Sequence, residues 1–167
     1  MQPRRHEDTK KNTRKDTKKN RFHVIVPMAI ALAMSTALRA QGPAREAEAR
    51  APIEAFFKAF NARDNEALKK TLHYPHVRIN EAGGVNVWRD ASEAGTNFEG
   101  LTRSEGWARS SLDSVTLRQN DPVKAHFEVV FSRYKADGTK YATYQSLWVV
   151  TKNGSGWGVQ ARSSFAP

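Results

Sequence analysis

The sequence predicts an α+β fold, with helices packed on one face of a curved and mostly antiparallel sheet. Over residues 53–75 apolar side chains recur every three or four positions, which is the period of a helix. From Ser114 onward they alternate with polar side chains, which is the period of a strand, and turns containing Asn, Asp and Gly separate the stretches. Helices followed by consecutive strands are typical of the α+β class.

The first 40 residues have the pattern of a signal peptide. A polar, basic stretch precedes the apolar run 24–38, and small residues stand next to the expected cleavage bond. Arg39 ends the apolar run short of the roughly 20 residues that a membrane-spanning helix needs. We expect cleavage after Ala40 and export to the periplasm or the medium, with membrane contact only during export. The alternative is a membrane anchor formed by residues 22–40.

The positive charge of the chain is concentrated in this leader. Residues 1–40 contain 10 of the 27 Lys and Arg and 3 of the 17 Asp and Glu, which leaves 17 basic and 14 acidic residues in the rest. A small, evenly mixed excess of +3 argues against nucleic acid as a partner, because nucleic-acid-binding faces gather basic residues. The chain contains no cysteine, which excludes disulfides and a thiolate nucleophile. The length that remains is sufficient for one domain that folds unaided.

We expect residues 41–52 to form a tether or the frayed start of a helix, and residues 53–167 to form a single domain. The tether is rich in alanine and charge, without an apolar stripe. The domain begins with a helix, because four large apolar residues share one face: Ile53, Phe56, Phe57 and Phe60. A second helix is predicted from a cap at Asp64 or Asn65 to Pro75, since the residue before a proline disfavours helical backbone angles.

A β-hairpin is predicted after the second helix. The period of the sequence changes to two, which places Val77 and Ile79 toward the core and His76 and Arg78 on the opposite side. The pair Gly83–Gly84 turns the chain into the second strand of the hairpin.

A third helix and a long meander complete the domain. The capping-box pattern Thr102-x-x-Glu105 predicts a short helix that carries three apolar residues, Trp107, Ala108 and Leu112. Four strands follow, at residues 114–119, 124–134, 140–151 and 156–165. A two-residue turn at Asp137–Gly138 pairs the middle strands so that one apolar side holds three pairs: Phe131 with Tyr144, Val129 with Ser146 and Phe127 with Trp148.

This order of elements resembles the nuclear transport factor 2-like (NTF2-like) superfamily, in particular its small SnoaL-like, DUF4440-type domains. The resemblance is carried by the helices IEAFFKAFNARD and NEALKKTL, the strand HVRI with its hairpin, and the final GSGWGVQARSS. It implies a cone of three helices on a curved sheet around a central pocket, and a homodimer formed through the sheet. The superfamily includes isomerases, cyclases, dehydratases and binding modules, so the fold does not determine the function.

The resemblance does not extend to the catalytic groups of isomerase-type members. Those proteins use a carboxylate base on the strand after the second helix, and a tyrosine and a protonated carboxylic acid that bind the enolate oxygen. Here the base position falls at Ile79 or Asn80, the first helix offers phenylalanine in place of tyrosine, and the acid position falls near Ser146. None of these residues is able to take the required role.

Histidines are the remaining candidates for chemistry. His73 and His76 lie three residues apart, but Pro75 separates them, and a metal site would need His126 or Glu128 as a further ligand. We expect neither a metal nor a cofactor. His76 is the best candidate for an acid-base catalyst, because it begins the strand where this fold places its pocket. The alternative is a histidine that is hydrogen-bonded within the sheet.

Arginine and aromatic residues are candidates for a ligand pocket. If no extra residue in the loop 152–156 interrupts the alternation of sides, Arg162 lies near Ser146 on the apolar side. A buried arginine there requires a carboxylate partner or an anionic ligand. Otherwise Arg162 is exposed or structural. The tryptophans suit either a core or a pocket for a flat apolar molecule. The expected pocket comprises Tyr74, His76, Trp88, Trp107, Phe127, Tyr144, Trp148 and Arg162.

Three functions remain open from the sequence. The first is an exported domain that binds a small, largely apolar organic molecule, which the missing carboxylates favour. The second is a SnoaL-like lyase or isomerase with His76 as its acid-base group. The third is a non-catalytic scaffold that dimerises through its sheet.

Overall fold

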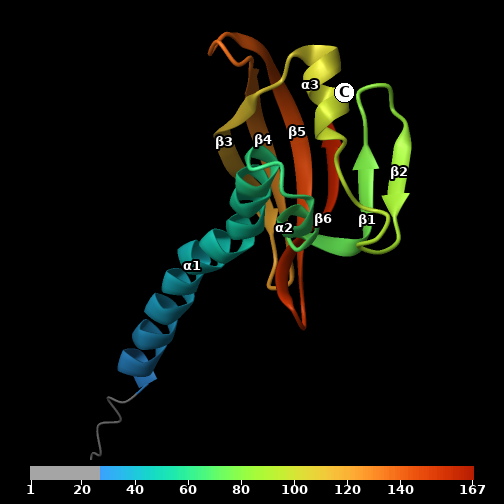
Figure 1. The fold of residues 1–167 in the computed structure, drawn as a ribbon. Coiled ribbons are helices and arrows are strands. Elements are labelled where there is room, and N and C mark those ends of the chain that lie inside the picture. Colours follow the sequence, from blue (N-terminus) through green and yellow to red (C-terminus); the bar gives the residue numbers. More distant parts are fainter. Residues whose placement is uncertain (1–26) are drawn as a thin grey trace, which may run out of the picture.

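The computed structural model describes residues 27–167, and the predicted leader falls largely on residues outside this range. Within it, six strands form one sheet in the order β2-β1-β6-β5-β4-β3, in which only β1 and β6 are parallel neighbours. The three helices of this part of the chain lie on one face of the sheet (Figure 1), which confirms the predicted α+β class. The elements are α1 Pro27–Asn61, α2 Asn65–Lys69, β1 Leu72–Ile79, β2 Val85–Trp88, α3 Phe98–Glu105, β3 Arg109–Asn120, β4 Lys124–Tyr134, β5 Lys140–Asn153 and β6 Gly156–Ser164. Across residues 27–167 we find no helix with the length and hydropathy of a membrane span.

The apolar core lies between α1 and the inner face of the sheet. All four residues that the helical spacing placed on one face are buried: Ile53, Phe56, Phe57 and Phe60. The pairing predicted for the meander is also present, with Phe131 opposite Tyr144, Val129 opposite Ser146 and Phe127 opposite Trp148. Helix and sheet thus bury the faces that the two periods of the sequence defined.

Residues 41–52 are part of α1 and not a separate tether. Ala49 is buried, and Arg50 Nη2 donates a hydrogen bond to Val115 O of β3 at 2.6 Å. Alanine and most charged residues are good helix formers, so this segment needs no apolar stripe to be helical once it contacts the sheet. Pro52 therefore lies inside α1.

Helix α2 ends at Lys69 and does not continue to Pro75. Asp64 caps it, as predicted, but the residues that follow form strand β1. They do so because β6 pairs with them, beginning at Val159. His73, which falls within the helix predicted up to Pro75, is consequently a buried strand residue. Pairing with a strand more than 80 positions away overrides the local helical period.

The two faces of β1 are reversed relative to the prediction. His76 has no exposed surface and Arg78 is half-buried on the inner face, whereas Ile79 is 37% exposed on the outer face. The hairpin itself is confirmed, with His76 opposite Trp88. The reversal arises because β1 joins the sheet through β6, where Arg78 lies beside Arg162 on the inner face. An alternating pattern defines two faces but does not say which one is covered.

Helix α3 begins and ends before the predicted positions. Asn97 is its N-cap, and Gly106 ends it with a φ of 71° in the left-handed region. Thr102 therefore lies in the later part of the helix, where its hydroxyl donates to Trp107 O at 3.1 Å instead of capping an N-terminus. The three apolar residues assigned to this helix follow it in the chain: Trp107, Ala108 and Leu112.

Candidate functional site

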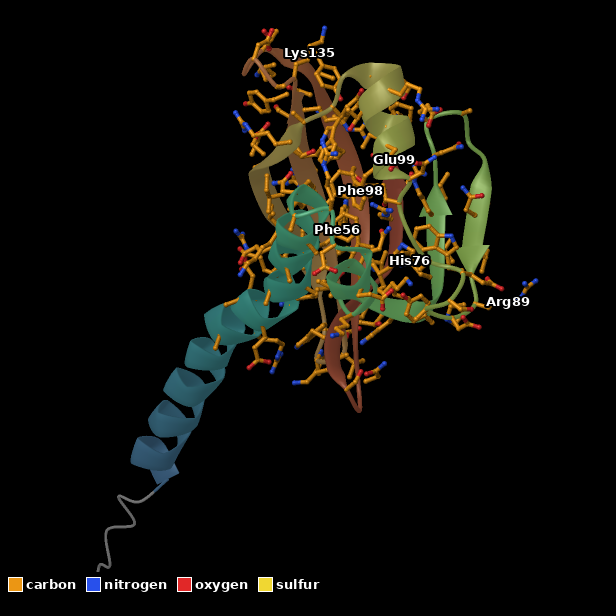
Figure 2. The ribbon with its side chains drawn as sticks, viewed as in Figure 1. Phe56, His76, Arg89, Phe98, Glu99 and Lys135 are labelled. Carbon is orange, nitrogen blue, oxygen red and sulfur yellow. The ribbon has the colours of Figure 1, made fainter. Side chains whose placement is uncertain are left out.

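A cavity of about 180 Å³ lies between α1, α3 and the inner face of the sheet. Aromatic rings form part of its lining, here called the aromatic wall: Phe56, Phe57, Phe60, Trp88, Phe131 and Trp148. Polar side chains form another part, here called the polar wall: Arg78, Thr96, Asn97, Ser110, Arg133, Ser146, Arg162 and Ser164. Phe56, labelled in Figure 2, belongs to α1 and lines this cavity.

The rings of the aromatic wall hold one another in place. The Phe56 and Trp148 rings meet edge to face with centroids 5.0 Å apart, and Phe57 stacks on Trp148 at 5.8 Å. Phe131 contacts Phe57 with ring centroids 5.3 Å apart. Trp148 Nε1 donates to Ser146 Oγ at 2.8 Å, which fixes the indole. The wall is therefore preformed for a flat apolar group.

Arg162 lies on β6 inside this cavity without a charged partner. It pairs with Trp148 across the sheet, and its guanidinium carbon lies 4.6 Å from the centre of the Phe56 ring. Protein surrounds the side chain, which retains some accessible surface because it lines the cavity. Its buried Nε has no hydrogen-bond partner, and no carboxylate in the described part of the chain forms an ion pair with it. Burial, together with Arg78 and Arg133, lowers the pKa of Arg162 to about 9, so the group remains a cation at pH 7.

The two other arginines of the cavity differ in their partners. Arg133 Nη1 forms an ion pair with Glu105 Oε2 of α3 at 2.5 Å. Arg78 forms no ion pair within residues 27–167, and its Nη2 donates a long hydrogen bond to Ala166 O at 3.4 Å. Burial lowers the pKa of Arg78 as well. The polar wall thus carries two cations that no described carboxylate neutralises directly, Arg78 and Arg162.

His76 is buried next to the cavity but does not line it. Its Nδ1 lies 3.0 Å from Val159 O, and because a carbonyl only accepts, Nδ1 carries the proton and Nε2 does not. The ring stacks on Trp88 with centroids 5.4 Å apart. Burial, followed by the charge of Arg162, lowers the pKa of His76 to about 4, so the imidazole is neutral at pH 7. A base of this strength outside the cavity is poorly placed for acid-base catalysis.

Three of the eight residues predicted for the pocket line the cavity: Trp88, Trp148 and Arg162. The other five do not: Tyr74, His76, Trp107, Phe127 and Tyr144. Trp107 and Phe127 belong to the core and have no exposed surface. Sequence reasoning missed Arg133, although the period of two on β4 places it on the same side as Phe127. It also missed Ser110, which lies in a segment that the sequence predicted as helix.

The residues considered for a metal site do not gather in one place. His73 and His76 are buried on β1, whereas His126 and Glu128 lie on the outer face of β4. Across residues 27–167, no three His, Asp or Glu side chains gather closely enough to bind a metal ion.

Comparison with known proteins identifies the family. Residues 45–164 match the family described as NTF2-like protein (DUF6841). The chain belongs to this family. The predicted NTF2-like superfamily is thereby confirmed, while the SnoaL-like subtype stays a prediction. A search of curated proteins gave no match to this NTF2-like chain.

Solved structures of similar fold come from several bacteria. An NTF2-like protein with a cystatin-like fold from Novosphingobium aromaticivorans is 16% identical, with a TM-score of 0.59 over 84% of this chain and 90% of that one. An NTF2-like protein of unknown function from Pseudomonas putida KT2440 is 17% identical, with a TM-score of 0.60 over 75% and 89%. A protein of unknown function with a cystatin-like fold from Nostoc punctiforme is 14% identical, with a TM-score of 0.58 over 71% and 88%. These identities show the fold alone.

Proposed function

We propose that this NTF2-like protein binds a small organic molecule with an apolar body in the cavity between α1, α3 and the sheet. The observation that carries the proposal is a cavity of about 180 Å³ whose lining combines interlocked aromatic rings with polar side chains. A concave apolar site with a few polar groups is the usual form of a small-molecule site. Because a cavity of about 150 Å³ accommodates benzene, one ring with a small substituent matches this volume.

Filling the cavity tests this proposal. Leu101 of α3 lines the cavity, so Leu101→Trp should occupy it and abolish the binding of monocyclic compounds, measured by ligand-observed NMR. Val123 is 57% exposed in the turn between β3 and β4, so Val123→Trp adds the same ring elsewhere and should bind as the wild type does. Binding that survives in Leu101→Trp would refute the proposal.

The lyase or isomerase alternative has less support. Among the residues that line the cavity in the described chain there is no Asp or Glu. His76, the candidate acid-base group, lies outside the lining, and its pKa of about 4 makes it a weak base. We therefore propose binding without turnover.

We also propose that a second copy of the chain covers the outer face of the sheet. Two rows of residues, apolar except for Ser163, cross β2, β1, β6 and β5 on that face: Val85, Ile79, Ser163 and Leu147, and Val87, Val77, Ala161 and Val149. Leu147 is 61% exposed. Next to the rows, Arg118 and Glu128 form an ion pair at 2.6 Å, so these two charges offset each other. Such a patch is complementary to itself, as a twofold dimer requires.

Sedimentation of the variant Leu147→Arg tests the dimer. We expect the wild type to sediment as a dimer at micromolar concentration and Leu147→Arg as a monomer, because the substitution would bury two unpaired charges at the interface. Val123→Arg, in the exposed turn, should leave the dimer intact. A monomeric wild type would refute the proposal.

Finally, we propose that residues 1–40 direct export of the domain. The support is the order of a basic stretch, an apolar run and small residues. The intact mass of the exported protein should begin at Gln41, whereas a mass that retains residues 22–40 would indicate an anchor.

A further inference from the structure

We propose that the ligand of the cavity is a ring-sized organic carboxylate held by Arg162 and Arg78. The inference rests on the proposed binding function and adds the charge of the ligand to it. Arg162 is a guanidinium enclosed by protein that no carboxylate of residues 27–167 neutralises through an ion pair. Enclosing a charge costs free energy that only a paired group offsets. A carboxylate on the ligand supplies that group.

Arg78 and Arg162 lie side by side on the polar wall. They are register partners on the parallel strands β1 and β6, and both line the cavity. Like charges at neighbouring positions of a sheet repel each other. A carboxylate has two oxygens that match the fork of a guanidinium, so an anion placed between the two arginines replaces repulsion by attraction.

The other charges of the cavity do not neutralise this pair. Arg133, the third arginine, already forms its ion pair with Glu105. In the described chain, no Asp or Glu is among the lining residues. A neutral ligand of the same shape would therefore leave both free cations, Arg78 and Arg162, without a charged partner.

The aromatic wall favours a ring-bearing carboxylate over an inorganic anion. The guanidinium carbon of Arg162 lies 4.6 Å from the centre of the Phe56 ring and 5.7 Å from that of Trp148. An anion bound to Arg162 is thus close to the aromatic wall. The carboxylate of the ligand must therefore be attached to the ligand's ring directly or through a short link. Inorganic phosphate would contact the polar wall and leave the aromatic wall uncovered.

Isothermal titration with benzoate, benzamide and inorganic phosphate tests the charge of the ligand. Benzoate and benzamide share ring and shape but differ in charge. We expect benzoate to bind at least about tenfold more tightly than benzamide, because hydrogen bonds to charged groups are the stronger ones. Equal binding of the two would overturn the charge inference and leave the proposed binding function standing. Binding of neither ring compound would overturn both, and phosphate binding more tightly than benzoate would overturn the assignment of a carboxylate.

Variants of the two arginines test the residues. Arg162→Met and Arg78→Met should each weaken benzoate binding about tenfold or more and change benzamide binding by less than about threefold. Arg162→Lys keeps the charge but loses the fork, so its affinity should lie between those of Arg162→Met and the wild type. Arg118→Met, on the outer face, is the matched control and should bind benzoate as the wild type does. Circular dichroism establishes that each variant is folded, and unchanged benzoate binding by both Met variants would overturn the assignment.

Discussion

Replacing Arg162 by methionine should make the ligand-free protein more stable. Methionine has a similar length and no charge, so it fits beside the Phe56 and Trp148 rings and removes an enclosed cation. Groups that exist to bind a ligand often cost stability when the ligand is absent. A purely structural arginine would give the opposite sign, so the direction of the change separates the two roles.

The size of the expected gain follows from the surroundings of Arg162. Its pKa falls from 12.5 to about 9, chiefly through burial, which corresponds to at most roughly 5 kcal/mol against the charged form. Contact with solvent in the cavity and attraction to the two rings offset part of this cost. We therefore expect Arg162→Met to raise the free energy of unfolding by about 1–4 kcal/mol, the range typical of apolar replacements of buried charges.

Urea unfolding followed by tryptophan fluorescence, in a buffer without organic anions, measures the change. Arg133→Met is the matched control, because Arg133 lines the same cavity but forms an ion pair with Glu105. Its replacement removes the ion-pair partner of Glu105, which keeps only the hydrogen bond from the Tyr141 hydroxyl, and should lower the free energy of unfolding by about 3–5 kcal/mol. If Arg162→Met destabilised the protein as Arg133→Met does, Arg162 would be structural and the reasoning would be refuted.

Three further predictions concern other buried groups. Burial holds the pKa of His76 at about 4 in the folded chain, against an ordinary 6.5, so the unfolded chain takes up the proton first as the pH falls. The free energy of unfolding should therefore drop by up to about 3 kcal/mol between pH 6.5 and 4. The drop should be smaller in His76→Gln, and an unchanged urea midpoint of the wild type over this range would contradict the lowered pKa of His76. The methyl group that Gly158→Ala adds would collide with the ring of His73, so we expect the free energy of unfolding to fall by about 1–3 kcal/mol. In a protein that also carries His73→Ala, this loss should largely disappear. Equal losses with and without His73→Ala would exclude the contact as the cause. Ala49→Asp buries an unpaired charge and should lower the free energy of unfolding by about 3 kcal/mol in chemical denaturation. Ala47→Asp, at an exposed position of the same helix, should lower it by less than about 0.5 kcal/mol. Equal losses would mean that residues 41–52 do not pack on the domain.

Local sequence information predicted the elements that depend on neighbouring residues. The spacing of Phe56 and Phe60 identified the buried face of α1 before any partner was known. The register that a two-residue turn at Asp137–Gly138 predicts for β4 and β5 is present, although the turn comprises residues 136–138 and a bulge at Arg133 and Tyr134 compensates for the extra residue. These predictions required no knowledge of the rest of the chain.

Elements that depend on distant pairing could not be predicted in the same way. β1 begins early and turns His76 inward because β6 pairs with it. The position of Arg162 depends on a register shift next to Val149, without which Arg162 would be opposite Leu147 on the outer face. The sequence shows no signal for this shift, so the apolar side and the outer side were equally open to Arg162.

The charge of the cavity favours holding an anion over making one. A general base acts best when its pKa lies near the working pH, and cations lower the pKa of any base beside them. Arg162 has this effect on His76, whose pKa is about 4. The same cations would stabilise an enolate, yet the described lining has no Asp, Glu or His side chain to remove the proton that its formation requires. An anion that arrives already ionised needs no such base, and it is the species that two unneutralised arginines bind most strongly.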